Sequence, residues 1–303
     1  VANDATGLSD DDVWVVGTAA GLGDASSTSV PLALHYDGSA WVDVPVPLMG
    51  NRHNAFQAVS ASAPDNVWAV GTWRNQAGGF KALIERWDGA SWSPVSNPGD
   101  GLGEWEAFSV LALAPDGAWL AAGGSDRALR VWSTSNGVER FAADMGPVTA
   151  LAASPDGASL AAAGLDGTVR IWAIESGALE ASALIPSAPL EALAWSPDGK
   201  LVATGGQDGK VYLFERGGRG LRTVRGTPDA PVMALAFSPN MKLLAVGGKS
   251  RSVELLPLVD SVARRSLAGH ALAVTSLTFA ADGQRLVAGV ADGAARIHEL
   301  RSG

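Results

Sequence analysis

Few side chains in this sequence have the types and spacing that enzyme or metal chemistry requires. The chain has 303 residues, no cysteine and only two tyrosines, Tyr36 and Tyr212. A glycosidase with a tyrosine nucleophile also needs an arginine cluster and a general acid, and no arginine trio recurs near either tyrosine. The four histidines show no metal-ligand spacing; they are His35, His53, His270 and His298. We therefore expect no catalytic residue, no metal site and no cofactor.

Two further segments resemble ligand sites at first sight. The glycine-rich stretch 216–226 lacks the Lys-Ser/Thr ending of a phosphate loop, and it does not open a helix. We interpret it as a solvated basic loop. The acidic run 10–12 could attract a cation, but it aligns with the ordinary turn at 64–66. We interpret it as a turn.

Charge and hydropathy narrow the range of partners. The formal net charge is −9, and residues 1–104 carry 4 Lys/Arg against 12 Asp/Glu, whereas the remainder carries 18 against 19. This balance argues against nucleic-acid binding, which depends on neutralising phosphates. No apolar run approaches the roughly 20 residues that span a bilayer, and no signal peptide is visible after Val1. We expect a soluble chain without nucleic-acid or membrane partners, and we leave its compartment open between bacterial cytoplasm and secretion.

The sequence from residue 108 onward repeats five times. A leucine recurs at intervals of 40, 42, 42 and 42 residues, at Leu111, Leu151, Leu193, Leu235 and Leu277. Each leucine lies in a short apolar segment followed by a turn such as 155–157 (Pro-Asp-Gly), a second apolar segment, a second turn and a third strand. A period of this length predicts stacked β-sheet units.

These five units resemble the WD-repeat family over about residues 105–303, as in 154–157 (Ser-Pro-Asp-Gly) and 165–172 (Leu-Asp-Gly-Thr-Val-Arg-Ile-Trp). The resemblance implies β-propeller blades in which a turn aspartate, a closing tryptophan and the histidine of a Gly-His pair are structural. The matching positions are Asp126, Asp166, Asp208, Asp292, Trp132, Trp172 and His270. Gly269-His270 is the only Gly-His pair, so we expect that network to be incomplete in most blades. We interpret His298, at a closing position, as a tolerated substitution and not a ligand.

A second motif occurs twice before these units. Residues 12–18 (Asp-Val-Trp-Val-Val-Gly-Thr) and 66–72 (Asn-Val-Trp-Ala-Val-Gly-Thr) are each followed by an Asp-Gly-x-x-Trp corner, at 37–41 and 88–92. Residues 1–98 are similar to Asp-Val-Trp-Ala-Val-Gly repeats of bacterial propeller proteins. The corner resembles the Asp-box of sialidase-type propellers only poorly, because one residue between Asp and Gly is missing. We expect the tryptophans to pack within blades and not to bind sugars.

Two units and five units predict an all-β fold, a single seven-bladed β-propeller of four-stranded antiparallel blades. The expected blades are 1–49, 50–98, 99–143, 144–186, 187–228, 229–269 and 270–303. The pattern supplies one strand too few. Either the last blade has three strands, or residues 1–8 pair there, or flanking sequence supplies the strand.

The expected function is a non-enzymatic scaffold, in which the monomer binds a protein or peptide through one face of loops. By the resemblance, this face comprises the entries to the inner strands and the turns between second and third strands. The residues are Ser109, Thr149, Glu191, Met233, Thr275, Ser125, Leu165, Gln207 and Ala291. Two alternatives stay open: an engineered or naturally recombined hybrid propeller without a selected ligand, and a secreted glycan-binding module.

Overall fold

The computed structural model describes most of the chain as β-strands and turns. The described residues are 2–9, 11–20, 29–49, 52–74, 80–95, 108–125, 127–185, 189–217, 221–224, 230–260, 262–292 and 294–300. None of them forms a helix long and apolar enough to cross a membrane.

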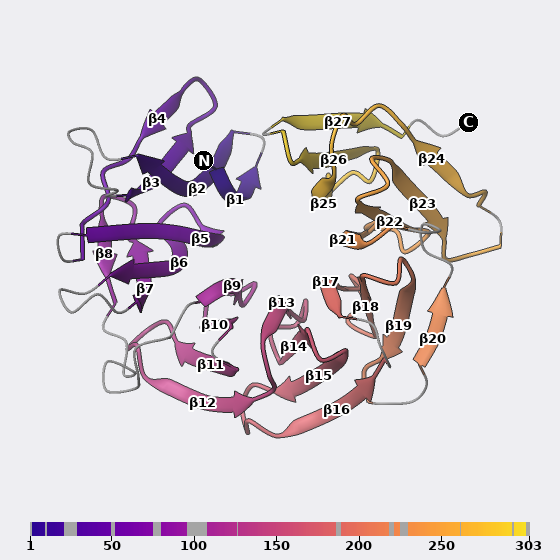
Figure 1. Cartoon of the computed structure of the whole chain (residues 1–303), viewed down its shortest axis with the longest axis horizontal. Coiled ribbons are helices and arrows are strands. Elements are labelled where there is room, and N and C mark those ends of the chain that lie inside the picture. The colour runs from indigo at the N-terminus through magenta and orange to yellow at the C-terminus, as the bar shows by residue number, and fades with distance from the viewer. Residues whose placement is uncertain are drawn as a thin grey trace. The chain divides into compact units, whose positions relative to one another are not determined.

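The strands form seven antiparallel sheets, each built from consecutive strands (Figure 1). The first three sheets are β1 (Ala2–Ser9), β2 (Asp12–Ala20), β3 (Ser29–Tyr36) and β4 (Trp41–Asp43); β5 (Arg52–Ala63), β6 (Asn66–Arg74), β7 (Phe80–Trp87) and β8 (Trp92–Pro94); and β9 (Phe108–Leu113), β10 (Trp119–Gly124), β11 (Ala128–Ser133) and β12 (Glu139–Asp144). The next two are β13 (Val148–Ala153), β14 (Ser159–Gly164), β15 (Thr168–Ala173) and β16 (Leu179–Leu184); and β17 (Leu190–Trp195), β18 (Leu201–Gly206), β19 (Val211–Glu215) and β20 (Leu221–Val224). The last two are β21 (Val232–Phe237), β22 (Leu243–Gly248), β23 (Val253–Pro257) and β24 (Arg265–Leu267); and β25 (Val274–Phe279), β26 (Arg285–Val290) and β27 (Ala295–Glu299).

This architecture is the predicted all-β, seven-bladed propeller with four-stranded blades and a three-stranded last blade. Residues 2–9 form β1 and pair with β2 in the first sheet. The alternative in which residues 1–8 complete the last blade is therefore wrong. By their contacts the residues divide into two compact units, 1–151 (unit 1) and 152–303 (unit 2).

Each unit has its own apolar core between sheets. In unit 1, Phe108 and Trp132 of the third sheet pack with Trp68 and Val70 of the second. In unit 2, Leu213 packs with residues of β21 and β22. The second strands β10 and β14 are buried along their whole length, and both end in small residues, as at 121–124 (Ala-Ala-Gly-Gly). Small side chains allow the neighbouring sheets to approach closely, which explains the alternation of large and small residues in the repeat.

The Pro-Asp-Gly segments form the predicted turns. In the fourth sheet, the Ser154 hydroxyl donates a hydrogen bond to Asp156 and accepts one from the Ser159 amide. Gly157 has φ +68°, which explains the glycine. The hydrogen bonds to Asp156 lower the pKa of its carboxyl to about 2, with Ser154 contributing most and Arg216 next. The aspartate of this turn is therefore structural.

Most tryptophans of the first two sheets are packing residues, as predicted. Trp14, Trp68 and Trp92 are buried, whereas Trp41 is about half exposed. Trp14 stacks on His35 at 4.3 Å between ring centroids, and the His35 Nε2 lies 2.9 Å from an Asp12 oxygen.

The second sheet repeats this arrangement with other residues. The Trp68 Nε1 donates to the Asn66 Oδ1 at 2.9 Å, and the Arg86 Nε donates to the same oxygen at 3.1 Å. An acceptor, a tryptophan and a basic side chain thus tie β6 to β7, as Asp12, Trp14 and His35 tie β2 to β3.

Candidate functional site

The predicted face residues at the strand entries lie at β-bulges. In the ladder between β17 and β18 the register shifts between Leu190 and Ala192, which leaves Glu191 out of the pairing. The same shift occurs around Met233 and around Thr275. A bulge inserts one residue and re-aims its side chain. Glu191, Met233 and Thr275 are therefore presented by one repeated backbone feature.

Glycines at the ends of the second strands permit this geometry. A Cβ on Gly206 would lie 1.9 Å from the Pro189 carbonyl oxygen, and one on Gly248 would lie 2.0 Å from that of Pro231. The backbone amide of the residue after each glycine donates to the carbonyl that the glycine approaches. The Gln207 amide, for example, donates to the Pro189 carbonyl at 3.0 Å. Each turn between second and third strand is thereby held against the entry of the inner strand.

Within unit 2 this contact brings predicted residues together in pairs. The Gln207 Nε2 donates to the Glu191 Oε1 at 3.2 Å, so the carboxylate of the strand entry and the side-chain amide of the turn lie in direct contact. In the last sheet the Ala291 amide donates to the Ala273 carbonyl at 2.9 Å, which places Ala291 next to the bulge of Thr275. Ala291, Thr275 and Gln207 are exposed, and Glu191 is half-buried.

The sixth sheet contains a face residue that the sequence interpretation omitted. The Lys249 amide donates to the Pro231 carbonyl at 3.1 Å, beside the bulge of Met233. Lys249 is exposed and follows Gln207 by 42 residues, so the same repeat register could have identified it. Met233 is half-buried, and Leu165 of the fourth sheet is 47% exposed.

In unit 1 the third sheet carries the equivalent residues of the strand entry and the turn, Ser109 and Ser125. The register between β9 and β10 shifts between Gly123 and Gly124, at Ser109. Ser109 and Ser125 are exposed, and Thr149 of β13 is half-buried.

The predicted structural positions lie in turns and sheet interiors. The Asp166 carboxylate accepts from the Thr168 amide at 2.9 Å, and Asp208 and Asp292 accept from the backbone amide two residues later in the same way. Trp132 and Trp172 are buried. Asp126 lies outside the described residues.

His270 and His298 form a pair in the last sheet. Their Nε2 atoms are 3.2 Å apart, and His270 is buried with its Nδ1 unpartnered. Burial lowers the pKa of both imidazoles, and the charge of nearby Arg296 lowers them further. Among the described residues, no group of three His, Asp or Glu side chains gathers as metal ligands.

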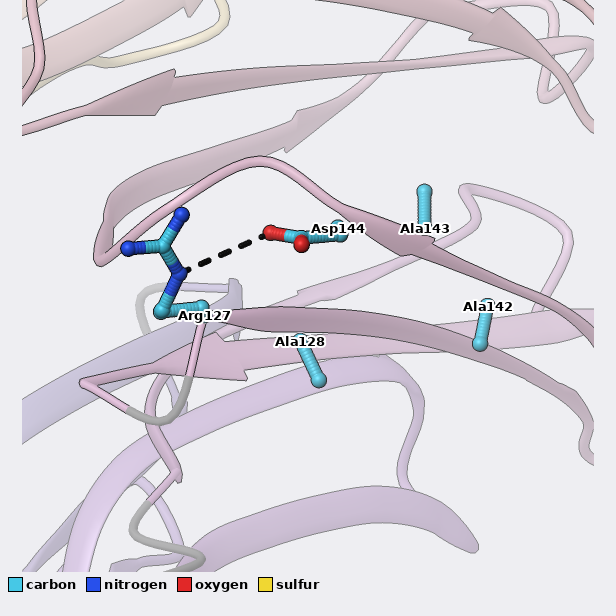
Figure 2. Close-up of a pocket in the computed structure, with 5 residues that line it drawn as sticks. All are labelled: Arg127, Ala128, Ala142, Ala143 and Asp144. Atoms are coloured by element: carbon cyan, nitrogen blue, oxygen red, sulfur yellow. Dashed lines mark ion pairs between the residues drawn. The ribbon is translucent and has the colours of Figure 1, made fainter.

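A separate depression in unit 1 has a volume of about 360 Å³ (Figure 2). Three alanines and the ion pair of Arg127 and Asp144 line it, with 3.7 Å between Arg127 Nε and Asp144 Oδ1. Both charged side chains are largely exposed. The depression is open, and the only titratable side chains among the described residues of its lining are the two of this exposed ion pair.

The carboxyls with shifted pKa values also have structural explanations. Hydrogen bonds from Ser39 and from backbone amides lower the pKa of Asp37 to about 2, and backbone amides lower that of Asp88. Both aspartates cap the Asp-Gly-x-x-Trp corners. Glu85 lies in the core of unit 1, where burial raises its pKa to about 8.

Two family models match the chain. Residues 104–133, 139–173 and 186–215 match "WD domain, G-beta repeat", and residues 235–303 match "Anaphase-promoting complex subunit 4 WD40 domain". The chain therefore contains WD40 repeats, as the resemblance implied. The relation of residues 1–98 to bacterial propeller repeats stays a prediction. A search of curated proteins finds no match.

Two solved structures resemble the chain over nearly its full length. The crystal structure of Sqt1 from Chaetomium thermophilum shares 22% identity with a TM-score of 0.73, over 100% of this chain and 82% of that one. Sqt1 from the same organism bound to the N-terminus of ribosomal protein L10 shares 21% identity with a TM-score of 0.75, over 99% of this chain and 85% of that one. At this identity the similarity shows the fold.

Proposed function

We propose that the chain is a non-enzymatic β-propeller scaffold that binds a protein or peptide partner on the loop face. The observation that carries this proposal is the repeated bulge at Glu191, Met233 and Thr275. Each bulge turns one side chain out of the ladder, and the following turn is held beside it. The scaffold thus offers a regular series of variable positions on a rigid frame, which suits recognition of an extended polypeptide.

The chemistry of the face supports a polypeptide ligand. Glu191 supplies a negative charge and Lys249 a positive charge, while Met233 and Leu165 supply apolar surface. A mixture of both charges and apolar side chains matches the composition of a protein segment. Sqt1, which has the same fold, is seen bound to the N-terminus of a ribosomal protein, and this supports a peptide partner.

The other candidate functions lack comparable support. A glycan site would use exposed aromatic platforms, but Trp14, Trp68 and Trp92 are buried. Trp41 is about half exposed, and its ring packs beside Tyr36 at 5.4 Å between centroids. Catalysis would need a poised acid, base or nucleophile, and the carboxyls with shifted pKa values are explained by turns or by burial in a core.

A peptide-display selection tests the loop face. We expect wild-type protein to enrich a peptide family whose binding falls at least roughly tenfold in the double variant Glu191→Lys/Met233→Ala. The matched control is Lys200→Glu, because Lys200 is 80% exposed in the turn at the opposite end of β17 and β18. Enriched peptides that bind wild type and the double variant equally would refute the assignment of this face.

A further inference from the structure

The turn between β22 and β23 differs from the corresponding turns of other sheets. In the fourth, fifth and last sheets this turn carries an aspartate, whose Oδ1 accepts a hydrogen bond from the backbone amide two residues later at 2.9 to 3.0 Å. In the sixth sheet Ser250 stands at that position, and its hydroxyl donates to the Ser252 carbonyl at 3.2 Å. No carboxylate of the described residues accepts from the Ser252 amide. A neutral hydroxyl thus replaces the carboxylate of the other turns.

The next residue of this turn has an unusual backbone conformation. Arg251 has φ +59°, in the left-handed region that favours glycine. The corresponding residues of the fourth and fifth sheets are Gly167 and Gly209, with φ +80° and +71°. The fold therefore needs only a glycine here, which adopts this conformation without strain. An arginine in its place points to a role of the side chain outside the packing of the sheet.

The third sheet has an arginine at the same turn position, and there it has a partner within the fold. Arg127 has φ +71° and forms an ion pair with Asp144, with 3.7 Å between Nε and Oδ1 (Figure 2). By the register of the outer strands, the counterpart of Asp144 in the sixth sheet is Ala268. An alanine cannot pair with a guanidinium, and no described residue forms an ion pair with Arg251. The charge of Arg251 therefore stays available to a ligand.

A second positive charge lies in the same turn. Lys249 and Arg251 are both exposed. The acidic side chains around them already have partners, because Glu191 accepts from a glutamine of its own sheet and Glu254 pairs with Arg264 at 3.1 Å. The turn thus combines two cations, two hydroxyls and a backbone amide that no carboxylate occupies.

We propose that the turn of residues 249–252, the basic turn, binds an acidic side chain of the partner segment. The carboxylate takes the place of the absent turn aspartate, accepts from the Ser252 amide and is neutralised by Lys249 and Arg251. A turn that contains a left-handed residue directs successive amides toward one point, which suits an anion. This inference rests on the proposed function of the loop face and names the chemistry that the partner brings to it.

A variant with the turn of the neighbouring sheets provides the sharpest test. Ser250→Asp/Arg251→Gly installs the Asp-Gly pair found at 166–167 and 208–209, so we expect it to fold normally. Peptides selected by display on wild type should carry an aspartate or glutamate at a constant position, and their affinity should fall at least roughly tenfold in this variant. The matched control is Lys242→Glu, because it makes the same change in net charge at an exposed position at the opposite end of β22.

Changes in the peptide complete the comparison. Replacing its acidic residue by the matching amide should weaken binding to wild type by a similar factor and leave binding to Ser250→Asp/Arg251→Gly nearly unchanged, because both changes remove one interaction. A phosphoserine at that position identifies the source of the anion: tighter binding indicates a phosphorylated segment, and weaker binding an unmodified acidic one. Peptides that need Met233 but carry no constant acidic residue, or that bind both proteins equally, overturn this inference and leave the proposed function standing.

Inorganic phosphate tests the anion site without a peptide. Titrated against chloride at constant ionic strength, it should shift the amide resonance of Ser252 saturably in wild type. The shift should be absent in Ser250→Asp/Arg251→Gly, where the new carboxylate occupies the turn. An absent or non-saturating shift in wild type overturns the inference whatever the peptide selection yields.

Discussion

Glu85 should make the stability of unit 1 fall as the pH rises. Its side chain is fully buried in β7, and neither carboxyl oxygen has a hydrogen-bond partner. It pairs across the sheet with Ala69 and Pro94, and Ala69 belongs to the apolar cluster that contains Trp14 and Trp92. A carboxyl in such surroundings stays protonated, because ionisation would place an uncompensated charge in the core.

The magnitude follows from the raised pKa. Burial raises the pKa of Glu85 from an ordinary 4.5 to about 8. Below the ordinary value both states are protonated and stability is fully present; as the pH rises, the unfolded state ionises first and gains free energy relative to the folded state. At about 1.4 kcal/mol for each pH unit, roughly 3 kcal/mol of stability should be lost between about pH 5 and 8.

Urea unfolding followed by tryptophan fluorescence measures this loss, because Trp14 and Trp92 report on the core around Glu85. Glu85→Gln should abolish most of the difference between pH 5 and pH 8, and Glu85→Leu should be more stable than wild type at pH 8 by about 2 to 4 kcal/mol. Glu175→Gln is the control, because Glu175 is exposed. If the free energy of unfolding changed with pH in the same way in wild type and in Glu85→Gln, the reasoning would be refuted.

Three further substitutions test features of unit 2. Arg216→Ala removes hydrogen bonds of 2.6 and 2.7 Å to Asp156 and Ser159, and we expect a loss of about 1 to 2 kcal/mol in urea unfolding, discounted because Asp156 is half exposed. An unchanged midpoint would contradict this role. Gly206→Ala should cost about 3 kcal/mol or more, since its Cβ would lie 1.9 Å from a carbonyl oxygen, and a near-neutral result would contradict the close backbone approach. His298→Trp should reduce a loss of stability that wild type shows below about pH 6.5, because burial lowers the pKa of both imidazoles and only that of His270 remains in the variant. Hydrogen exchange of β27 at pH 5 and 7.5 measures it, and equal acid sensitivity in the variant would contradict it.

The architecture could be predicted from sequence because the repeat uses the same physical solution many times. The interval between leucines and the Pro-Asp-Gly turns locate the strands without knowledge of distant contacts. The bulges could not be predicted, because they depend on a close approach between Gly206 and the Pro189 carbonyl, and a glycine pair at a strand end also suits an ordinary turn.

The buried carboxyl of Glu85 and the histidine pair were missed for a different reason. A single glutamate in β7 has no pattern that distinguishes an inward from an outward side chain, because its neighbours Ile84 and Arg86 suit either orientation. His298 was interpreted as a tolerated substitution, and its contact with His270 joins residues 28 positions apart. The arrangement could be found only from the fold.

The bulges separate the residues that build the fold from those available for recognition. Two positions after each bulge stands a repeated leucine, at Leu193, Leu235 and Leu277, whereas the bulge itself carries Glu191, Met233 or Thr275. Acidic, thioether and hydroxyl side chains all occupy the same backbone feature, which indicates that packing does not select among them. Met233→Glu should therefore change stability by less than about 0.5 kcal/mol.

The same substitution should alter peptide recognition, because it places a second carboxylate on the loop face near Lys249. Urea unfolding and binding of a selected peptide, measured on the same preparation, separate the two effects. A large loss of stability would show that Met233 belongs to the core and not to the face. Unchanged stability together with unchanged binding of every selected peptide would show that the bulges do not carry recognition.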